Sequence, residues 1–364
     1  MDALLKRSIT LILFGLFSIL TGCSTQPHLE LTKTTYDELP AWNRDNHSQS
    51  LRAFQRSCRE IIKRNPYSNF SKLTGSGKVG HWQQACYAAS HIAENNNPAA
   101  QAFFEAWFEP YQISNNAETN GLFTGYYLPL LHGSLTANRY YAIPIYGIPM
   151  DFAANKKYYH SAYPDRASIN NGAIHYKTPV LAWTHDPIEL FFAQIQGSAI
   201  VELTNHQRFI ISYAANNGHR YTAIGKILRD EYGIPKEQIS MQTIKYWLRQ
   251  HPAKINTILN RNASYVFFKV LHNDDPLGAE RIPLLPERSL AVDLHYIPLG
   301  APLWLNTTAP NMQRLMIAQD TGGAIKGVVR GDVYWGTGDK AEYYAGHMQS
   351  PGQYWILLPR GISS

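Results

Sequence analysis

From residue 121 onwards, the chain consists largely of short runs of β-branched and aromatic residues that Pro and Gly interrupt every few positions. Runs of this length and composition favour strands, and the Pro and Gly residues between them favour turns. The predicted strands cover residues 122–128, 142–146, 189–195, 199–203, 208–213, 264–270 and 353–359. Many short strands separated by turns are typical of small β-barrels, so we predict two β-rich regions of this kind.

Apolar residues with helical spacing occur in three parts of the chain. Between residues 49 and 110 they recur at intervals of three or four, for example at Leu51, Phe54 and Cys58. Two further helices are predicted at 221–233 and 240–250, the second with Ser240 as its N-cap. The chain is therefore expected to be mainly β, with N-terminal helices.

The first residues have the features of an export signal. Lys6 and Arg7 precede an apolar run at 9–20, which is shorter than the roughly 20 residues that span a bilayer. The sequence LTGC at 20–23 resembles the bacterial lipobox, whose cysteine is acylated and becomes the first residue. We predict a signal peptide at 1–22, a lipid on Cys23 and a polar tether at 23–48. An uncleaved anchor with an incidental cysteine is the alternative.

The predicted lipid would place the protein on a membrane surface. Each buried methylene contributes about 0.8 kcal/mol of membrane affinity, so several acyl chains would hold it permanently. By resemblance to lipoprotein sorting, Ser24 after the cysteine points to the outer membrane. We therefore expect a lipid-anchored protein on the periplasmic face of the outer membrane.

Two cysteines remain after the leader, Cys58 and Cys86, both in helical stretches. In an oxidising periplasm, two cysteines are most simply explained by a disulfide bond. The alternative is a pair of buried thiols. Neither His nor further Cys residues are spaced around them for a zinc site.

Length and charge limit the class of protein. The 364 residues, 45% of them hydrophobic, are enough for about two domains with a sizeable core. The net charge is +6, without the dense Lys and Arg runs of nucleic-acid binders. Aromatic residues reach 12%, led by 23 Tyr, which suits stacking on sugar rings but is also common in β-rich cores. We predict an anionic polymer, not nucleic acid, as the partner.

Several motifs in the sequence do not support a cofactor or metal site. The stretch GSGKVG at 75–80 matches a dinucleotide-binding pattern, but no predicted strand precedes it, so we interpret it as a loop between helices. The 14 His residues are scattered, and none forms a His-Glu-x-x-His motif. We therefore predict neither a metal nor an organic cofactor.

The clearest candidate site lies in residues 318–348, where Asp320 and Asp332 occur among closely spaced glycines. Glycines permit tight turns and close backbone approach, so they can hold carboxylates in a shaped site. Asp320 belongs to QDTGG, and Asp-Thr-Gly is also the signature of aspartic proteases. Those enzymes need two such aspartates sharing a proton, and this chain has one such motif. A third aspartate, Asp293, stands in SLAVDLHYIPLG.

These aspartates carry a resemblance to a known family. Residues 287–359 resemble the 3D domain, named for three aspartates, and residues 50–360 resemble the MltA family of membrane-bound lytic murein transglycosylases. The supporting stretches are FTGYY at 123–127, IQGS at 195–198, SYAANNGHRYTAIGK at 212–226, SMQTIKYWL at 240–248, YVFFK at 265–269 and RSLAVDLHYIPLGAPLWL at 288–305.

The resemblance implies a two-part fold. Residues 49–128 and 271–364 would form a discontinuous double-psi β-barrel, with the catalytic 3D segment at about 287–359. Residues 129–270 would form a second, smaller β-barrel inserted into the first. The glycan groove of the family lies between the two.

The resemblance also implies a reaction. The family cleaves the β-1,4 bond between N-acetylmuramic acid and N-acetylglucosamine in peptidoglycan without water, leaving a 1,6-anhydro end. Its catalytic acid and base maps onto Asp332, with Asp320 and Asp293 as supporting residues. The implied partners are peptidoglycan strands and the membrane; contacts with other murein enzymes are left open, and we expect a monomer.

One carboxyl group is enough for this chemistry. The C6 hydroxyl of the muramyl residue is an intramolecular nucleophile, so no positioned water is needed. Asp332 would protonate the leaving oxygen and then accept the hydroxyl proton. It must therefore begin protonated, although the ordinary pKa of Asp is about 3.9. Burial beside Tyr334 and Trp335, or the charge of Asp320, would raise the pKa of Asp332.

Residues that could contact the glycan are polar or aromatic and lie near the predicted groove. Tyr126 could equally belong to the core, and Gln196 and Ser198 are expected to end an apolar strand. The candidates are Thr124, Tyr126, Tyr127, Gln196, Ser198, Tyr334 and Trp335. Two other functions remain open, namely a non-catalytic peptidoglycan-binding lipoprotein of the outer membrane and a hydrolase on a related barrel.

Overall fold

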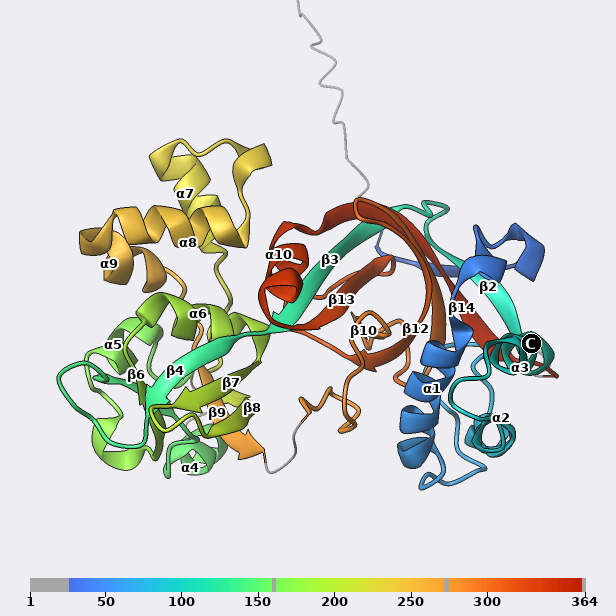
Figure 1. Cartoon of the computed structure of the whole chain (residues 1–364), viewed down its shortest axis with the longest axis horizontal. Helices are drawn as coiled ribbons and strands as arrows, with labels where there is room; N and C mark the ends of the chain where they lie inside the picture. The colour runs from blue at the N-terminus through green and yellow to red at the C-terminus, as the bar shows by residue number, and fades with distance from the viewer. Residues whose placement is uncertain (1–25, 159–161, 272–274, 362–364) are drawn as a thin grey trace, which may run out of the picture.

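The computed structural model describes residues 26–158, 162–271 and 275–361. The predicted signal peptide and Cys23 lie outside the described residues. The described chain forms two sheets with separate sets of helices, seen at the left and right of Figure 1. None of the helices in these ranges has the length and apolar character needed to cross a membrane.

The helices and strands have the following bounds. The helices are α1 (His47–Ile61), α2 (Val79–Ser90), α3 (Asn97–Trp107), α4 (Phe152–Tyr158), α5 (Arg166–Asn170), α6 (Pro187–Gln196), α7 (Ile224–Tyr232), α8 (Met241–Gln250), α9 (Ile255–Leu259) and α10 (Asp339–His347). The strands are β1 (Leu29–Lys33), β2 (Phe108–Asn115), β3 (Gly121–Leu128), β4 (Leu130–Ser134), β5 (Ile143–Tyr146), β6 (Val180–Thr184), β7 (Ser198–Leu203), β8 (Arg208–Asn216), β9 (Val266–Leu271), β10 (Ser289–Val292), β11 (Pro302–Thr308), β12 (Asn311–Asp320), β13 (Arg330–Thr337) and β14 (Gln349–Pro359).

The larger sheet has eight strands in the order β1-β2-β14-β11-β12-β10-β13-β3. Strand β14 also pairs with β3, so six strands from β14 to β3 form a closed ring of pairings. Two pairs in the ring, β10 with β12 and β13 with β3, are parallel, and the others are antiparallel. The sheet is therefore mixed, and its core contains fully buried side chains such as Trp304 and Tyr354.

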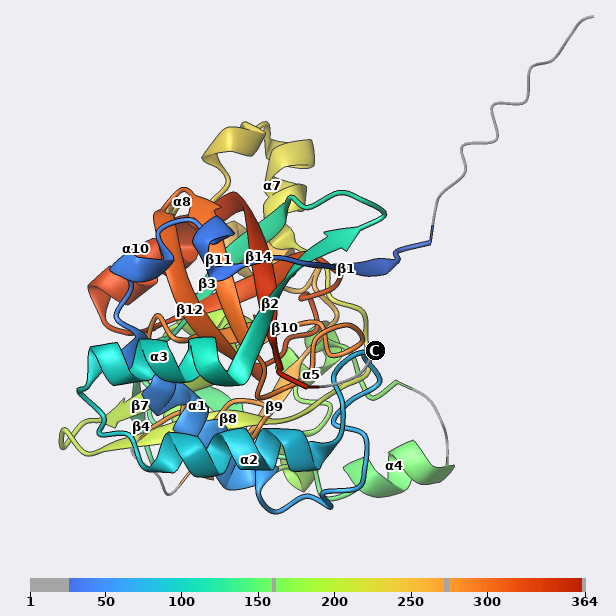
Figure 2. The same ribbon diagram turned by 90° about the vertical axis from the view of Figure 1, so that its right-hand side faces the viewer.

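The N-terminal helices cover the larger sheet on one side, which faces the viewer in Figure 2. Helix α1 buries Leu51, Phe54 and Ile61, whose spacing places them on one face of the helix. Burial of each such side chain stabilises the fold by about 1.5–3 kcal/mol. Ser50 on the same helix donates a 2.7 Å hydrogen bond to the carbonyl of Leu315 in β12. The predicted helical N-terminal part is confirmed.

The smaller sheet has six strands in the order β5-β6-β4-β7-β8-β9. The chain enters it directly after β3 and leaves it after β9, so all six strands come from one continuous stretch. Helices α7, α8 and α9 lie together beyond one edge of this region (Figure 1). Both predicted helices correspond to α7 and α8, and Ser240 caps α8 by accepting a 3.1 Å hydrogen bond from the Thr243 amide.

The prediction of a strand at 189–195 is wrong, because this stretch forms helix α6. A short apolar run does not by itself distinguish a buried helix from a buried strand. The flanking residues decide in favour of the helix. Asp186 accepts hydrogen bonds from the amides of Ile188 and Glu189, and Gly197 ends the helix with a φ of 81°. The other predicted strands overlap β3, β5, β7, β8, β9 and β14.

The predicted tether at 23–48 is wrong from Leu29 onwards, because this part of the chain is folded. Strand β1 pairs with β2, and the side chain of Trp42 is 2% exposed. Its indole lies 5.0 Å from the ring of Trp304 and donates a hydrogen bond to Glu105. Contacts with residues far away in the sequence hold this segment, and its local sequence does not reveal them.

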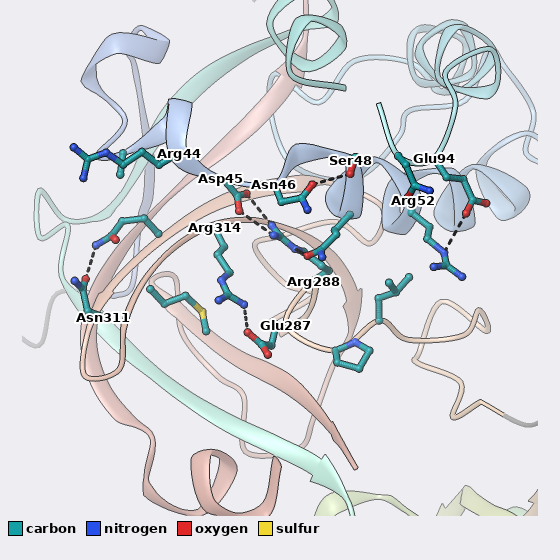
Figure 3. A pocket seen from close by; sticks show the side chains of 17 residues that line it. Arg44, Asp45, Asn46, Ser48, Arg52, Glu94, Glu287, Arg288, Asn311 and Arg314 are labelled. Atoms are coloured by element: carbon teal, nitrogen blue, oxygen red, sulfur yellow. Dashed lines mark hydrogen bonds and ion pairs between the residues drawn. The ribbon is translucent and has the colours of Figure 1, made fainter. Parts of the chain in front are cut away.

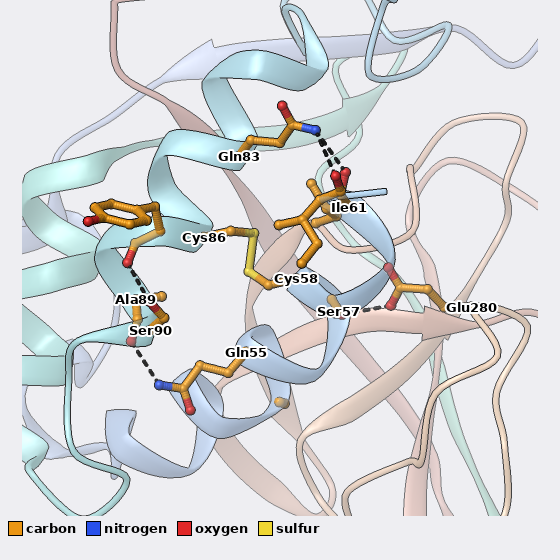
Figure 4. The surroundings of a disulfide bond; sticks show 12 residues. Gln55, Ser57, Cys58, Ile61, Gln83, Cys86, Ala89, Ser90 and Glu280 are labelled. Atoms are coloured by element: carbon orange, nitrogen blue, oxygen red, sulfur yellow. Dashed lines mark hydrogen bonds between the residues drawn. A yellow bond between two sulfur atoms is a disulfide. The ribbon is translucent and has the colours of Figure 1, made fainter. Parts of the chain in front are cut away.

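The predicted disulfide between Cys58 and Cys86 is present and links α1 to α2 (Figure 4). The two Cα atoms are 5.4 Å apart, and 28 positions separate the residues in sequence. Beside it, Gln55 and Gln83 donate hydrogen bonds to carbonyls of the opposite segment. The bridge therefore closes a helical hairpin that packs on the larger sheet.

We expect the double substitution Cys58→Ser/Cys86→Ser to lower the free energy of unfolding by about 3 to 4 kcal/mol, the loop entropy of a closure of this length. Guanidinium denaturation of both proteins measures the difference. A reductant should destabilise the wild type and leave the double variant unchanged. Equal unfolding free energies would contradict the expectation.

Candidate active site

The larger sheet places both C-terminal aspartates in one row across neighbouring strands. Ala291 on β10 pairs with Asp320 on one side and with Asp332 on the other, and Asp332 pairs in turn with Thr124 on β3. Paired residues project from the same face of a sheet, so the two carboxylates share a face. One strand separates them, which puts their backbones about 10 Å apart. Between them Ala291 contributes only a methyl group.

Asp332 is part of a chain of three polar side chains. The hydroxyl of Thr124 donates a 2.5 Å hydrogen bond to Oδ1 of Asp332, and Nη2 of Arg330 donates a 2.7 Å hydrogen bond to that hydroxyl oxygen. Burial raises the pKa of Asp332 to about 6, against the opposing effects of the Arg330 charge and the Thr124 hydrogen bond. The charge of Asp320 adds to the rise. The pKa of Asp332 therefore lies well above the ordinary value for Asp.

Asp320 is held by three donors. Its Oδ2 accepts a 2.8 Å hydrogen bond from the hydroxyl of Tyr126, and its Oδ1 accepts 2.9 Å bonds from the amides of Ala279 and Thr321. Burial raises the pKa of Asp320, and these hydrogen bonds oppose the rise. The ring of Tyr126 lies 5.2 Å from that of Tyr334, which Tyr126 faces across the β13–β3 pair. Tyr126 thus belongs to the site.

Asp293 lies outside this row and accepts a hydrogen bond that holds the connection between β12 and β13. Its Oδ2 accepts a 2.9 Å hydrogen bond from the amide of Gly327, and its Oδ1 accepts a bond from the amide of His295. Nearby, the hydroxyl of Thr321 donates to the carbonyl of Val292. Asp293 is therefore placed to fix the loop whose two ends carry the other two aspartates.

Three of the predicted glycan contacts lie at the junction of the two sheets. Tyr127 is buried, and its amide donates a 3.0 Å hydrogen bond to Oε1 of Gln196 at the end of helix α6. Ser198 begins β7, where its hydroxyl donates to that of Ser212. The prediction that Gln196 and Ser198 end an apolar strand is wrong, because Gln196 ends a helix and Ser198 begins a strand. The structure does not bring these three side chains into the aspartate row.

Trp335 also lies away from the aspartates. Its indole stacks on the ring of Tyr344 in α10, with the centroids 4.6 Å apart, and is 8% exposed. A Cβ atom at Gly125 would come within 2.5 Å of the indole nitrogen, so only glycine fits there. Successive strand residues point to opposite faces, which explains why Tyr334 joins the site while Trp335 packs under α10.

A buried ionic cluster connects the two sheet regions beside Tyr127. Lys245 on α8 is 3% exposed and donates hydrogen bonds of 2.6 Å to Glu189 on α6 and 2.8 Å to Glu342 on α10. Its ammonium group also reaches the hydroxyl of Tyr127 at 3.4 Å. Because α10 follows β13 directly, this cluster ties the smaller sheet region to the strand that carries Asp332.

A pocket of about 840 Å³ lies elsewhere on the larger sheet region, between the N-terminal segment and β12 (Figure 3). It contains none of the three aspartates of the motif. Three of its arginines are paired with carboxylates, as Arg288 with Asp45, Arg52 with Glu94 and Arg314 with Glu287. These three arginines already have carboxylate partners, so the aspartate row is the stronger candidate for an active site.

The sequence prediction missed Arg330 and the amide of Ala279. A usable signal existed for Arg330, because residues two apart on a strand share a face and Arg330 stands two before Asp332. The contact of Ala279 uses a backbone group and leaves no trace in the sequence. In the ranges 26–158, 162–271 and 275–361, no three His, Cys, Asp or Glu side chains come together as ligands for a metal ion.

Comparison with known proteins places this chain in a family. The profile of the MltA specific insert domain matches residues 122–269, and that of the 3D domain matches residues 288–358. A crystal structure of MltA from Neisseria gonorrhoeae shares 32% identity, with a TM-score of 0.74 over 93% of this chain and 94% of that one. The chain belongs to the MltA family.

A curated relative and a solved structure, both from Escherichia coli, extend the comparison. The membrane-bound lytic murein transglycosylase A of strain K12 is 36% identical over 249 residues, which is 65% of this chain and 66% of that protein. The aligned part thus spans about two thirds of the relative. A crystal structure of E. coli MltA with bound chitohexaose shares 27% identity, with a TM-score of 0.70 over 92% of this chain and 95% of that one.

The contacts of Arg330 generate a test of the site. We expect Arg330→Gln to raise the pKa of Asp332 by about one unit, because it removes a nearby opposite charge. Arg330→Lys should retain most of the charge effect. Carboxyl ¹³C NMR titration measures the pKa directly, with Arg208→Gln as a control at an exposed arginine of the smaller sheet. An unchanged or lowered pKa in Arg330→Gln would refute the assignment.

Proposed function

We propose that this protein cleaves peptidoglycan glycan strands as a lytic transglycosylase, breaking the β-1,4 bond between N-acetylmuramic acid and N-acetylglucosamine and leaving 1,6-anhydro ends. The observation that carries the proposal is Asp332, a carboxyl group with a pKa of about 6 on the same sheet face as Asp320. The names of the relatives and the oligosaccharide bound to E. coli MltA support the substrate class. The biological role would be turnover and recycling of the cell wall.

The proposed mechanism uses Asp332 twice. In the first step its proton passes to the glycosidic oxygen, and the bond from C1 of the muramyl residue to that oxygen breaks. The C6 hydroxyl of the same residue then forms a bond to C1, and its proton passes to the carboxylate of Asp332. The catalyst is regenerated and no water is consumed, so a second carboxylate is not needed as a nucleophile, unlike in most glycosidases.

The neighbours of Asp332 have distinct roles in this proposal. Thr124 fixes the direction of the carboxyl group through its 2.5 Å hydrogen bond. Asp320 supplies a negative charge that favours the protonated form of Asp332 and stabilises positive charge that develops on the sugar ring. Asp293 positions the loop between β12 and β13. No metal ion or organic cofactor has a part in these steps.

We extend the proposal to the architecture. The closed ring of six strands corresponds to the double-psi β-barrel of the predicted fold, and the six-stranded sheet to the inserted barrel at 129–270. The discontinuous domain at 49–128 and 271–364 then also includes β1 and the segment up to α1, which pack on it. The glycan would lie between the two parts, with Tyr126 and Tyr334 close to the reacting bond.

The location of the protein is proposed from its leader. Acylation of Cys23 would hold it on the periplasmic face of the outer membrane, where its peptidoglycan substrate is within reach. The disulfide between Cys58 and Cys86 supports export, because such bonds persist in oxidising compartments.

The first test is mass spectrometry of murein sacculi after digestion by the protein from Ser24 onwards. We expect anhydro-ended muropeptides from the wild type, and a loss of at least about 10²-fold in Asp332→Asn, because the variant cannot donate or accept the proton. Tyr221→Phe is a suitable control on the smaller region. Reducing ends would instead indicate a hydrolase. No products from either protein would favour a non-catalytic peptidoglycan-binding lipoprotein.

The second test is the pH dependence of the rate. Protonated Asp332 is the active form, so activity should fall as pH rises through its pKa of about 6. Asp320→Asn removes a charge that raises this pKa, so the falling limb should move to lower pH. In Arg330→Gln the same limb should move to higher pH. Identical limbs in all three proteins would show that neither charge acts on Asp332.

A further inference from the structure

A pocket of about 480 Å³ opens in the smaller sheet region, outside the aspartate row. Elements β5, α5, β6, α6 and α9 contribute to its wall. This volume lies within the usual range of small-molecule sites. Aromatic rings of Tyr146, Trp183, Phe191 and Tyr265 form part of the lining, and side-chain amides supply polar groups. Of these amides, that of Gln194 is buried and the others are exposed or half-buried. The lining amides are Asn170, Asn171, Gln194, Asn256 and Asn260.

The lining of this pocket contains a positive charge and no carboxylate. Of the residues that line it, Arg166 alone carries a permanent charge, and none is Asp or Glu. Arg166 is 4% exposed, and its guanidinium lies over the rings of Phe191 at 4.6 Å and Tyr265 at 5.1 Å. Burial lowers its pKa to about 10.

Among the described residues, the hydrogen-bond partners of Arg166 are all neutral. Its guanidinium donates to the carbonyls of Asn262 and Ser264 and to Oε1 of Gln194, at 3.0, 2.6 and 2.6 Å. These bonds use three of the five N–H donors of an arginine side chain. A buried charge without a counter-ion is costly, and a carboxylate is the partner that matches a guanidinium best. An anion bound in the pocket would therefore supply the counter-charge that the described residues do not give Arg166.

We propose that this pocket binds a carboxylate-bearing fragment of peptidoglycan, with Arg166 as its counter-charge and the aromatic rings and amides around its uncharged part. The inference rests on the proposed function, because it takes the ligand from the same polymer. Peptidoglycan offers this chemistry in two places, the lactyl carboxyl of a muramic acid residue and the carboxyl groups of the peptide stem. Such a site would hold the wall at a distance from Asp332 and bias which strands are cleaved.

The test uses small probes that the protein cannot cleave. N-acetylmuramic acid differs from N-acetylglucosamine by a lactyl ether on O3, which carries the carboxyl group. A dipeptide of L-alanine and D-glutamate carries carboxylates without a sugar. The readout is the indole NMR signal of Trp183, assigned through Trp183→Phe. We expect it to shift with N-acetylmuramic acid, with the dipeptide or with both, and to stay unchanged with N-acetylglucosamine. The probe that binds identifies the source.

Substitutions at two residues test whether binding takes place in this pocket. Asn256 is exposed on α9 at the rim, so Asn256→Asp should fold normally and weaken binding about three- to tenfold by repelling the carboxylate, while Asn256→Ala should change affinity less than twofold. Arg166→Gln should abolish binding if it folds. Equal binding of N-acetylglucosamine, no shift with any probe, or no effect of Asn256→Asp would overturn the proposal.

The outcomes separate this inference from the proposed activity. Wild-type protein that releases anhydro-ended products but shows no Trp183 shift would refute the pocket alone. A carboxylate-dependent shift in a protein that yields no anhydro-ended products would refute the activity alone.

Discussion

The candidate site depends on the closure of the six-strand ring by β14. This last strand pairs with β2 and β11 along one part of its length and with β3 at the other. Its pairing holds β3 against β13, and that contact sets Thr124 beside Asp332 and Tyr126 beside Asp320. Each backbone bond contributes only about 1 kcal/mol, so the position of the site relies on many bonds acting together.

Two opposing groups of effects determine whether Asp332 is protonated. Burial and the charge of Asp320 favour the neutral carboxyl group, whereas Arg330 and Thr124 favour the carboxylate. The balance leaves the pKa at about 6, which suits the proposed role of this group as first an acid and then a base. Asp320 can contribute charge without competing for the same proton, because a full strand lies between the two carboxyl groups and three donors hold its oxygens.

A buried ionic cluster connects the two sheet regions. Lys245 meets one carboxylate from each region, Glu189 and Glu342, in a nearly solvent-free position. Buried ion pairs add little net stability, but loss of one partner leaves an uncompensated charge and is costly. Such a cluster specifies how the two regions meet, and therefore where a glycan held by the smaller one would present its bond to Asp332.

The sequence by itself predicted an export leader, which lies outside the described residues, and it determined most strands and helices, the cysteine pair and the positions of the three aspartates. Each of these features depends on local spacing or residue type. It did not reveal helix α6, where caps outweighed an ambiguous apolar run, or the folding of residues 29–48, which depends on distant contacts. Only the tertiary structure brought Thr124 to Asp332 across 208 positions and separated Trp335 from the site. Such contacts depend on pairing between strands that are far apart in the sequence, and local sequence patterns do not predict which strands will pair.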